Sequence, residues 1–359
     1  MTLLGLRALL ARYDGPVRFV FSTENSKLQE KLAEIAAEFP KLTLEAQEEC
    51  SSKLEALRNR LKPSRARRLA ARFKEINPSL VVAVQGNIEH SSLALIAALQ
   101  AGVKSCSYIP VPHSNAEMGA KLGALRDCFC KPLFKLPDSF ITITDEMARM
   151  LKAGGAVAPI RIVYNGVDIQ RFQPGDRTQA REALGLPQDK VLAGVIGRIE
   201  FRKKQQHLLV QAVASNPDLV SKCHLVFAGD GPDADHLKEE LRKNGVAGTV
   251  LSWCDPAPLY RALDVLLVPS RYEGLPLAML EALASGTPVL ASDRDGMRDL
   301  LPPDLRFVPN DVSAIGKALS SFVQSGCPRA NPALVERVRA EMSLESFADS
   351  FSSTLIHLV

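Results

Sequence analysis

The chain has 359 residues, of which 46% are hydrophobic and 23% charged, and its formal net charge is +4. This balance excludes a disordered or fibrous protein, and the length is too great for one ordinary core, so two domains are expected. The mild positive charge suits anionic ligands such as phosphates but is too small to indicate nucleic acid as a partner.

The cysteines and the apolar segments bear on location. Seven cysteines is an odd number, and Cys128 and Cys130 lack the two-residue gap of common zinc knuckles, so reduced thiols in a cytoplasmic protein are expected. No apolar run approaches the roughly 18 residues that a membrane span needs. Residues 1–13 have no basic segment ahead of their leucines and predict an amphipathic helix rather than a signal peptide.

Short apolar or β-branched runs alternate with helix-length amphipathic segments along the chain, which predicts βαβ units and parallel sheets. The first series of expected strands is 17–22, 42–45, 80–84, 105–109, 140–144 and 160–164. The second series is 191–196, 224–228, 249–252, 265–269 and 289–292. The helices between them include 27–39, 207–215 and 233–244.

A polar stretch with no clear periodicity, residues 165–178, separates the two series and is punctuated by Gly166, Pro174 and Gly175. We therefore expect a Rossmann-like amino-terminal domain over 1–165 and a second one over 166–342. A terminal helix over 343–359 is expected to pack back on the first domain. Because ligands bind beyond the carboxyl ends of parallel strands, two such edges facing across a cleft are predicted.

The most informative segment is 265–292, VLLVPSRYEGLPLAMLEALASGTPVLAS. A strand ending at Pro269 leads into a loop with Glu273 and Gly274, and Pro276 is expected at the first position of a helix that ends before Gly286. The free backbone N–H groups and positive dipole end of this helix indicate a phosphate site. Gly274 would let the backbone approach the anion closely.

Two carboxylates, Glu273 and Glu281, flank this site. Beside a phosphate they would be repelled unless they accept hydrogen bonds, and sugar hydroxyls are suitable donors. In the alternative interpretation Glu273 caps the helix and Glu281 pairs with a surface cation. That alternative is favoured for Glu281 alone, because a lone helical glutamate is usually solvated, but the combination with the glycines and prolines favours ligand binding.

The segment resembles the E-x7-E signature of glycosyltransferase family 4, reading Glu273-Gly-Leu-Pro-Leu-Ala-Met-Leu-Glu281. Three other motifs agree with that family in order and spacing: Tyr164-Asn165-Gly166-Val167-Asp168 with Phe172 and Pro174, Gly197-Arg198 with Lys203, and Ala228-Gly229-Asp230-Gly231-Pro232. The likeness extends from about Ser105 to the end. It implies the GT-B fold, an α/β architecture of two doubly wound parallel-sheet domains.

The resemblance also implies an activity: retaining, metal-independent transfer of a hexosyl group, without a cofactor, from a UDP- or GDP-linked sugar. The acceptor would be a glycan or a lipid-linked molecule in polysaccharide or glycolipid biosynthesis. Arg198 and Lys203 would hold the donor diphosphate and stabilise charge on it. Glu281 would bind the ribose, Glu273 a hydroxyl of the donor sugar, and His113, which follows a strand, would contact that sugar near the reacting centre.

The implied donor-binding positions also include Gly197, Gly231, Gly274, Leu275, Pro276 and Leu277. Most members of the family have glycine where this chain has Lys204, so Lys203 and Lys204 both remain candidates for the clamp. A solvated basic turn is the alternative for Arg202 and Lys204. Members also begin with a strand and a glycine-rich loop, whereas Met1 here already lies in the expected first helix, so that strand and loop are expected to be missing.

Two other functions compete with this interpretation. Gly229, Gly231 and Ala234 fit a G-x-G-x-x-A dinucleotide fingerprint, with Asp255 as its acidic residue, which would indicate an NAD(P)-dependent oxidoreductase. A non-catalytic GT-B-like partner subunit is the second alternative, because of the missing loop.

Two further patterns bear on metals and membranes. Asp233-Ala-Asp235 and Asp293-Arg-Asp295 match a metal-binding D-x-D, but a helix start and a loop explain them, so no metal is expected. Segment 53–74 predicts one basic helix, opposed only by Glu55, that docks peripherally on anionic lipid at the cytoplasmic face or is simply solvated. Its cations are Lys53, Arg58, Arg60, Lys62, Arg65, Arg67, Arg68, Arg72 and Lys74.

Overall fold

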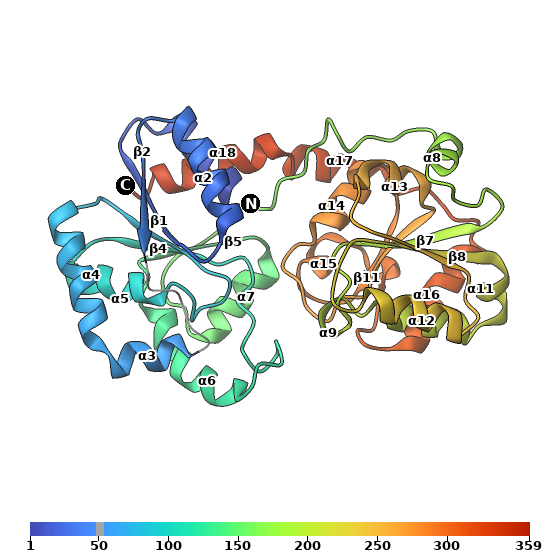
Figure 1. Cartoon of the computed structure of the whole chain (residues 1–359), viewed down its shortest axis with the longest axis horizontal. Helices are drawn as coiled ribbons and strands as arrows, with labels where there is room; N and C mark the ends of the chain where they lie inside the picture. The colour runs from blue at the N-terminus through green and yellow to red at the C-terminus, as the bar shows by residue number, and fades with distance from the viewer. Residues whose placement is uncertain (48–53) are drawn as a thin grey trace. The chain divides into compact units, whose positions relative to one another are not determined.

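The computed structural model describes residues 1–47 and 54–359 (Figure 1). Residues 48–53 lie outside the described residues, and they include Lys53, the first cation of the predicted basic helix. The chain divides into two compact units. The first comprises residues 1–164 and 345–359, and the second comprises residues 165–344.

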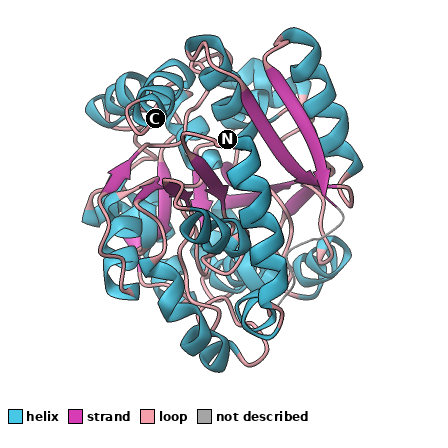
Figure 2. Ribbon diagram, turned by 90° about the vertical axis from the view of Figure 1, so that its left-hand side faces the viewer, coloured by secondary structure: helices cyan, strands magenta, loops and turns pink. Residues whose placement is uncertain are grey.

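The first unit carries two parallel sheets. One pairs β1 (Val17–Ser22) with β2 (Leu42–Gln47), and Figure 2 shows this pair as two long strands side by side. The other contains β3 (Val81–Val84), β4 (Ser105–Tyr108), β5 (Ser139–Thr142) and β6 (Ile160–Ile162) in that order. Each strand of the first predicted series is therefore confirmed: β1 has the predicted bounds, and the other five differ by one or two residues at one or both ends.

Helices lie before and between these strands along the chain, and a carboxyl-terminal helix also belongs to this unit. They are α1 (Thr2–Arg12), α2 (Ser26–Glu38), α3 (Glu55–Leu61), α4 (Pro63–Ile76), α5 (Ser92–Ala101), α6 (Gly123–Cys130), α7 (Asp145–Gly154) and α18 (Leu344–Ile356). The predicted amphipathic first helix is confirmed, because Leu6 and Leu10 of α1 join a buried cluster with Leu32 and Ile35 of α2. In α18, the Phe351 ring lies 5.2 Å from the Tyr108 ring at the end of β4.

The prediction of one basic helix over 53–74 is wrong. α3 ends at Leu61 and α4 begins at Pro63, with Lys62 in a non-helical conformation between them. Pro63 is the cause, because proline lacks the N–H that a continuing helix needs and its ring clashes with the preceding turn. Arg65 does not reach the surface either: it is buried, with its guanidinium 2.8 Å from the Glu55 carboxylate.

The second unit contains one parallel sheet in the order β12-β11-β10-β7-β8-β9. Its strands are β7 (Val191–Ile196), β8 (Cys223–Ala228), β9 (Gly248–Leu251), β10 (Val265–Val268), β11 (Val289–Ser292) and β12 (Arg306–Phe307). The five strands predicted here are confirmed. The sequence analysis missed β12, because two residues are too few to show an alternating pattern.

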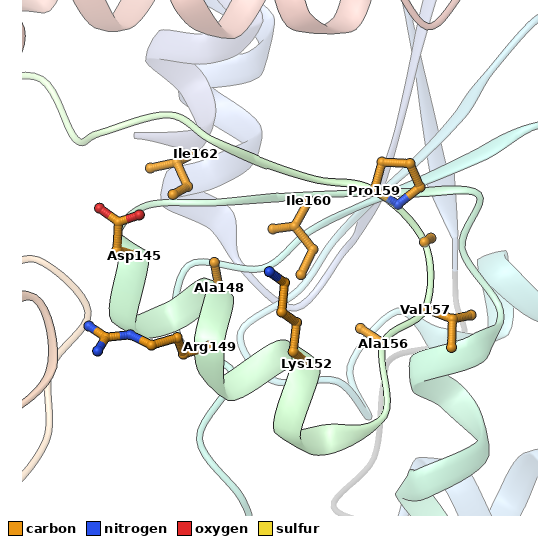
Figure 3. A pocket seen from close by; sticks show the side chains of 10 residues that line it. Asp145, Ala148, Arg149, Lys152, Ala156, Val157, Pro159, Ile160 and Ile162 are labelled. Carbon is orange, nitrogen blue, oxygen red and sulfur yellow. The ribbon is translucent and has the colours of Figure 1, made fainter.

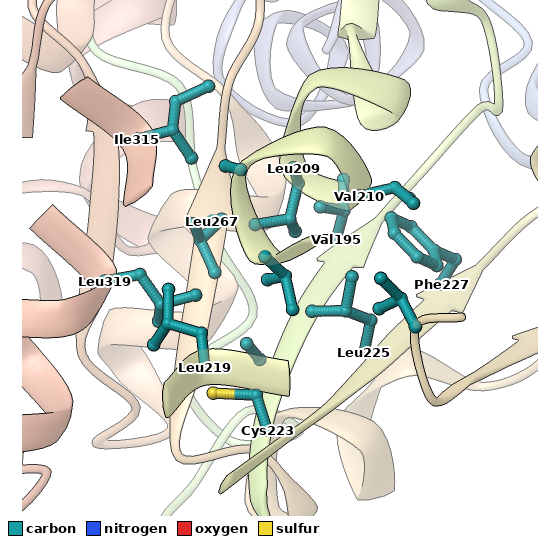
Figure 4. Close-up of a cluster of buried hydrophobic side chains, with 14 of the residues drawn as sticks. Val195, Leu209, Val210, Leu219, Cys223, Leu225, Phe227, Leu267, Ile315 and Leu319 are labelled. Carbon is teal, nitrogen blue, oxygen red and sulfur yellow. The ribbon is translucent and has the colours of Figure 1, made fainter. Parts of the chain in front are cut away.

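The helices of this unit are α8 (Arg177–Ala183), α9 (Phe201–Lys204), α10 (Gln206–Ala214), α11 (Pro217–Lys222), α12 (Ala234–Lys243), α13 (Pro256–Ala262), α14 (Leu277–Ala284), α15 (Asp295–Leu300), α16 (Val312–Gln324) and α17 (Pro332–Glu341). Figure 4 shows the core on one face of the sheet, where Leu209 of α10 and Ile315 and Leu319 of α16 meet Leu225 and Leu267 of the strands. Each such buried side chain contributes about 1.5–3 kcal/mol. No helix in the described part of the chain is long and apolar enough to cross a bilayer.

Candidate functional site

Predicted residues for the diphosphate and for the donor sugar lie in loops at the carboxyl ends of three adjacent strands of the second unit. β10, β7 and β8 are hydrogen-bonded neighbours. The loop after β7 carries Gly197 and Arg198, that after β8 carries Gly229 and Gly231, and that after β10 carries Glu273. The sheet therefore brings the glycine turn, the basic segment and the first glutamate to one edge.

The glycines hold two of these loops against each other. The Gly197 N–H donates to the Ala228 carbonyl at 2.9 Å, and the Ile199 N–H donates to the Asp230 carbonyl at 3.0 Å. A Cβ on Gly229 would lie 2.2 Å from the Gly197 carbonyl oxygen, and one on Gly231 would lie 2.0 Å from that of Ile199. No side chain fits there, so glycine is required for the contact between the loops.

This geometry gives another explanation for the dinucleotide fingerprint. Its two glycines meet neighbouring backbone, whereas in a Rossmann fingerprint a glycine admits the pyrophosphate. The expected ribose-binding acid, Asp255, instead caps α13 by accepting the Ala257 N–H at 3.1 Å, and it pairs with Arg171 at 2.7 Å. The geometry of these residues thus disfavours the oxidoreductase interpretation.

Glu273 is buried and held by two lysines of α9. The Lys204 ammonium donates to Glu273 Oε1 at 2.5 Å, and Lys203 Nζ lies 3.8 Å from Oε2. Lys203 Nζ also lies 5.0 Å from the centre of the Tyr272 ring. Lys204 is thus engaged with the carboxylate rather than solvated, while the Lys203 ammonium is not hydrogen-bonded to it.

Other contacts fix the backbone of the Glu273 loop. The Glu273 N–H donates to Asp295 Oδ2 at 2.8 Å, and the Gly296 N–H donates to the Gly274 carbonyl at 3.0 Å. The Asn165 amide, from the N-G-V-D motif, donates to the Leu275 carbonyl at 2.9 Å. The motif between the two strand series therefore supports the loop that precedes α14.

The partial positive charge at the amino-terminal end of α14 is not balanced, within the described chain, by an acidic residue in its first turn or by a capping side chain. Pro276, predicted as the first helical residue, is instead the N-cap with ψ of 123°, and the helix begins one residue later at Leu277. Backbone N–H groups at the start of a helix bind anions, so this end can accept a phosphate.

Glu281 occupies a mostly buried position on α14. The Tyr260 hydroxyl donates to Glu281 Oε2 at 2.7 Å, and burial raises the pKa of the Glu281 carboxyl, partly offset by that hydrogen bond and by Arg171. The interpretation of a solvated glutamate paired with a surface cation is therefore wrong. Keeping a carboxylate here costs free energy, which is typical of a binding position.

Arg198 has the opposite environment. Its side chain is 67% exposed, and Nε lies 3.4 Å from Glu200 Oε2. The Arg198 carbonyl accepts a hydrogen bond from the buried Gln206 amide at 2.9 Å, which fixes the backbone while leaving the guanidinium extended. An exposed arginine on a fixed backbone can bind an anionic ligand with little internal competition.

His113 lies in the first unit, in the loop after β4. Its side chain is fully buried, and Nδ1 is 3.6 Å from Glu117 Oε2. The Ser114 N–H and hydroxyl donate to the same carboxylate oxygen, each at 3.1 Å. The interaction with His113 is the main cause that lowers the pKa of Glu117 to about 2. At 3.6 Å the contact is too long for a hydrogen bond, so it is an electrostatic pairing between the imidazole and the carboxylate.

The acidic residues of the two D-x-D patterns have separate protein partners. Asp233 accepts the Phe201 N–H at 2.7 Å, and Asp235 pairs with Lys238 at 3.1 Å. Asp293 pairs with Arg298 and Arg306, while Asp295 supports the Glu273 loop. Among the described residues no cluster of potential metal ligands occurs.

Sequence reasoning missed Tyr260, Asn165 and Asp295 as supports of the site, because each contact spans 21 or more residues. It also passed over Trp253, the chain's single tryptophan. Trp253 is 75% exposed, two residues after β9, and its backbone N–H donates to Asp230 Oδ1 in the glycine turn at 3.3 Å. The available signal was that the sequence contains a single tryptophan.

A cavity of about 670 Å³ lies in the first unit between α7 and the segment leading into β6 (Figure 3). Ile160 and Ile162 form part of its apolar lining, and Arg149 and Lys152 add cations. None of the predicted site residues lines it.

Two family models match the chain. One, described as glycosyl transferases group 1, matches residues 176–337, and the other, described as glycosyltransferase family 4, matches residues 40–171. The chain belongs to glycosyltransferase family 4.

Curated relatives cover part of the chain. It is 38% identical over 45% of its length to D-inositol 3-phosphate glycosyltransferase of Geodermatophilus obscurus, and 31% identical over 54% to the lipopolysaccharide core biosynthesis mannosyltransferase LpsB of Rhizobium meliloti. The matches span 39% and 57% of these relatives.

Solved structures show the GT-B fold. HepE from Anabaena, in complex with UDP, has a TM-score of 0.75 at 17% identity, covering 99% of this chain and 96% of that one. Sucrose-phosphate synthase from Thermosynechococcus elongatus has a TM-score of 0.71 at 18% identity, covering 96% and 99%.

Proposed function

We propose that this protein is a retaining glycosyltransferase that takes a hexosyl group from a nucleoside-diphosphate sugar. The observation that carries the proposal is the pair of glutamates around the uncapped start of α14. Glu273 is held by Lys204, and Glu281 is kept in a mostly buried position that raises its pKa. An anion site flanked by two oriented hydrogen-bond acceptors fits a diphosphate with a sugar on either side.

The roles of the basic residues follow from their environments. The Lys204 ammonium is hydrogen-bonded to the Glu273 carboxylate, so Lys203 is the better candidate for the diphosphate clamp, together with Arg198. As the bond between the sugar and the diphosphate breaks, negative charge grows on the phosphate. Cations placed there stabilise the transition state more than the bound donor.

The expected stereochemical outcome is retention. Departure of the diphosphate leaves an oxocarbenium-like sugar, the acceptor oxygen attacks from the same face, and its proton passes to the leaving phosphate. His113, which lies beside Glu117, is assigned to the donor sugar on the strength of the family resemblance. No metal is needed in this scheme, because the clamp and the start of α14 neutralise the leaving group.

The donor is proposed to be UDP- or GDP-linked, which accords with the UDP bound in the HepE structure. The acceptor is proposed to be a glycan or lipid-linked molecule, as expected for an enzyme of polysaccharide or glycolipid biosynthesis. The name of one relative, a lipopolysaccharide core biosynthesis mannosyltransferase, supports a lipid-linked glycan acceptor, whereas the other relative is named for inositol 3-phosphate, a small phosphorylated molecule. A lipid-linked acceptor would place the protein at the surface of a membrane.

Two experiments test the proposal. A thermal-shift screen of nucleotide sugars identifies the donor, because a ligand at 100 times its dissociation constant adds about 2.7 kcal/mol of stability. NMR of the product from an α-linked donor should then show an α linkage, with turnover unchanged by EDTA. A β-linked product would overturn retention, and activity lost in EDTA and restored by manganese would overturn the metal-free scheme.

A further inference from the structure

Three large apolar side chains lie exposed on two neighbouring helices of the first unit. Leu61 at the end of α3 is 72% exposed, while Leu122 and Leu125 at the start of α6 are 70% and 55% exposed. Leu122 is the residue just before α6, in a left-handed conformation, and Leu125 lies in the first turn of that helix. We name the surface formed by these three leucines the leucine face.

The two helices are fixed to each other. The Arg60 guanidinium of α3 lies 5.4 Å from the centre of the Phe129 ring of α6. Both helices also reach the buried Glu89, whose Oε1 accepts the Ala56 N–H at 3.3 Å and whose Oε2 accepts from Arg126 at 2.5 Å. The leucines are therefore held at the surface by a rigid support.

The exposed charged residues of α3 and α6 and of the positions that flank these helices are basic. They are Arg60, Lys62, Lys121 and Lys131. The acidic residues of α3 and α6 turn inward instead. Glu55 is 1% exposed and pairs with Arg65 at 2.8 Å, and Asp127 accepts the backbone N–H groups of Asn115 and Ala116 at 2.8 and 3.1 Å. The leucine face should therefore attract a negatively charged surface more strongly than a protein surface of mixed charge.

We infer that the leucine face binds the surface of an anionic bilayer, with the leucines among the upper acyl chains and the cations at the headgroups. Exposed leucines ringed by lysine and arginine are the chemistry that a peripheral protein uses at such an interface. The inference deepens the proposed function, since it rests on the membrane location of a lipid-linked acceptor. It assigns the contact to α3 and α6 rather than to a continuous basic helix.

Vesicle co-sedimentation of the full chain at low salt tests the inference, using phosphatidylcholine with or without phosphatidylserine. The wild type should pellet with the anionic vesicles and much less with the neutral ones. The triple change Leu61→Ser, Leu122→Ser and Leu125→Ser should weaken partitioning about tenfold or more, because each buried CH₂ contributes to membrane affinity. Neutralising Lys121 and Lys131 to Gln should weaken it roughly fivefold per cation.

A matched control uses Leu99, which is 62% exposed on α5. Leu99→Ser should bind vesicles like the wild type, and circular dichroism melts should show that all variants fold. Equal binding by the triple variant and the wild type, or no pelleting of the wild type, would overturn the inference. So would sedimentation equilibrium showing that the triple change abolishes a dimer formed without lipid, since the partner would then be a second copy.

Donor hydrolysis in detergent-free solution separates this inference from the enzymatic one. The triple variant should hydrolyse the sugar donor at the wild-type rate, because none of the three leucines belongs to the donor site. Absence of hydrolysis and transfer in every variant, with vesicle binding intact, would refute the proposed activity and leave the membrane contact standing.

Discussion

Replacing Arg198 by alanine separates transition-state stabilisation from folding and from donor binding. The side chain is 67% exposed and its ion-pair partner, Glu200 Oε2, is 3.4 Å away. Its loss should change the free energy of unfolding by no more than about 0.5 kcal/mol. If the guanidinium stabilises charge on the departing diphosphate, turnover should fall by about 10²–10³, equivalent to about 2.7–4 kcal/mol. Nucleotide affinity should fall much less.

Trp253 makes the two effects measurable in one sample. As the single tryptophan, exposed at the carboxyl edge of the same sheet, it should report nucleoside diphosphate binding by a change in fluorescence. Arg202→Ala removes the same charge from exposed α9 and serves as the control, with near-normal turnover. Near-normal turnover in Arg198→Ala, or an equal loss of affinity and turnover, would refute the reasoning, since the interaction would then be absent or present equally in the ground state.

Four other substitutions have expected outcomes. Glu281→Gln should raise the melting temperature at pH 7, because burial raises the pKa of the Glu281 carboxyl above 4.5 and the charged form destabilises the fold. This gain should shrink as the pH falls through the raised pKa and should vanish near pH 4.5, where the carboxyl is also protonated in the unfolded chain. Fluorescence titration should show nucleotide affinity reduced roughly 10–100-fold. Lys204→Met should lower the free energy of unfolding, measured by chemical denaturation, by about 1–3 kcal/mol, because it removes the ammonium that is hydrogen-bonded to Glu273. Lys203→Met should lower it by less than about 1 kcal/mol but should reduce turnover about 10²-fold. If Lys204→Met reduced turnover more and stability less than Lys203→Met, Lys204 would be the diphosphate clamp. Glu117→Gln should lower the free energy of unfolding by up to about 1 kcal/mol at pH 7, because a carboxyl whose pKa is lowered from 4.5 to about 2 stabilises the fold above pH 4.5. This cost should vanish as the pH falls through 2. A cost that does not depend on pH would contradict the electrostatic pairing of Glu117 with His113.

Local sequence patterns predicted the strands well, because each parallel strand is a short apolar run bounded by turn residues. The bounds of β7 and β11 match the predicted ranges at both ends. The break at Pro63 was also visible in the sequence, yet the density of basic residues favoured one continuous helix. The inward position of Arg65 was not visible, since it depends on Glu55 across the break.

The sequence identified candidate residues for the site but not the contacts that surround each of them. The environment of Glu281 depends on Tyr260, which lies 21 residues away, and that of Lys204 depends on Glu273, which lies 69 residues away. Pairings at such separations are set by the order of strands in the sheet, which no local pattern contains. The glycine turn was identified, but its contact with the Gly197 and Ile199 carbonyls required the three-dimensional arrangement of the loops.

The two separate sheets of the first unit affect how this protein behaves in concentrated solution. β1 and β3 each end a sheet within the described chain, and each carries an outward-facing valine: Val20 is 42% exposed and Val84 is 36% exposed. An open strand edge with apolar side chains is a template for pairing with another chain. Purification should therefore favour low concentration and moderate salt, and a lysine in place of Val20 is the substitution best placed to keep the protein monodisperse.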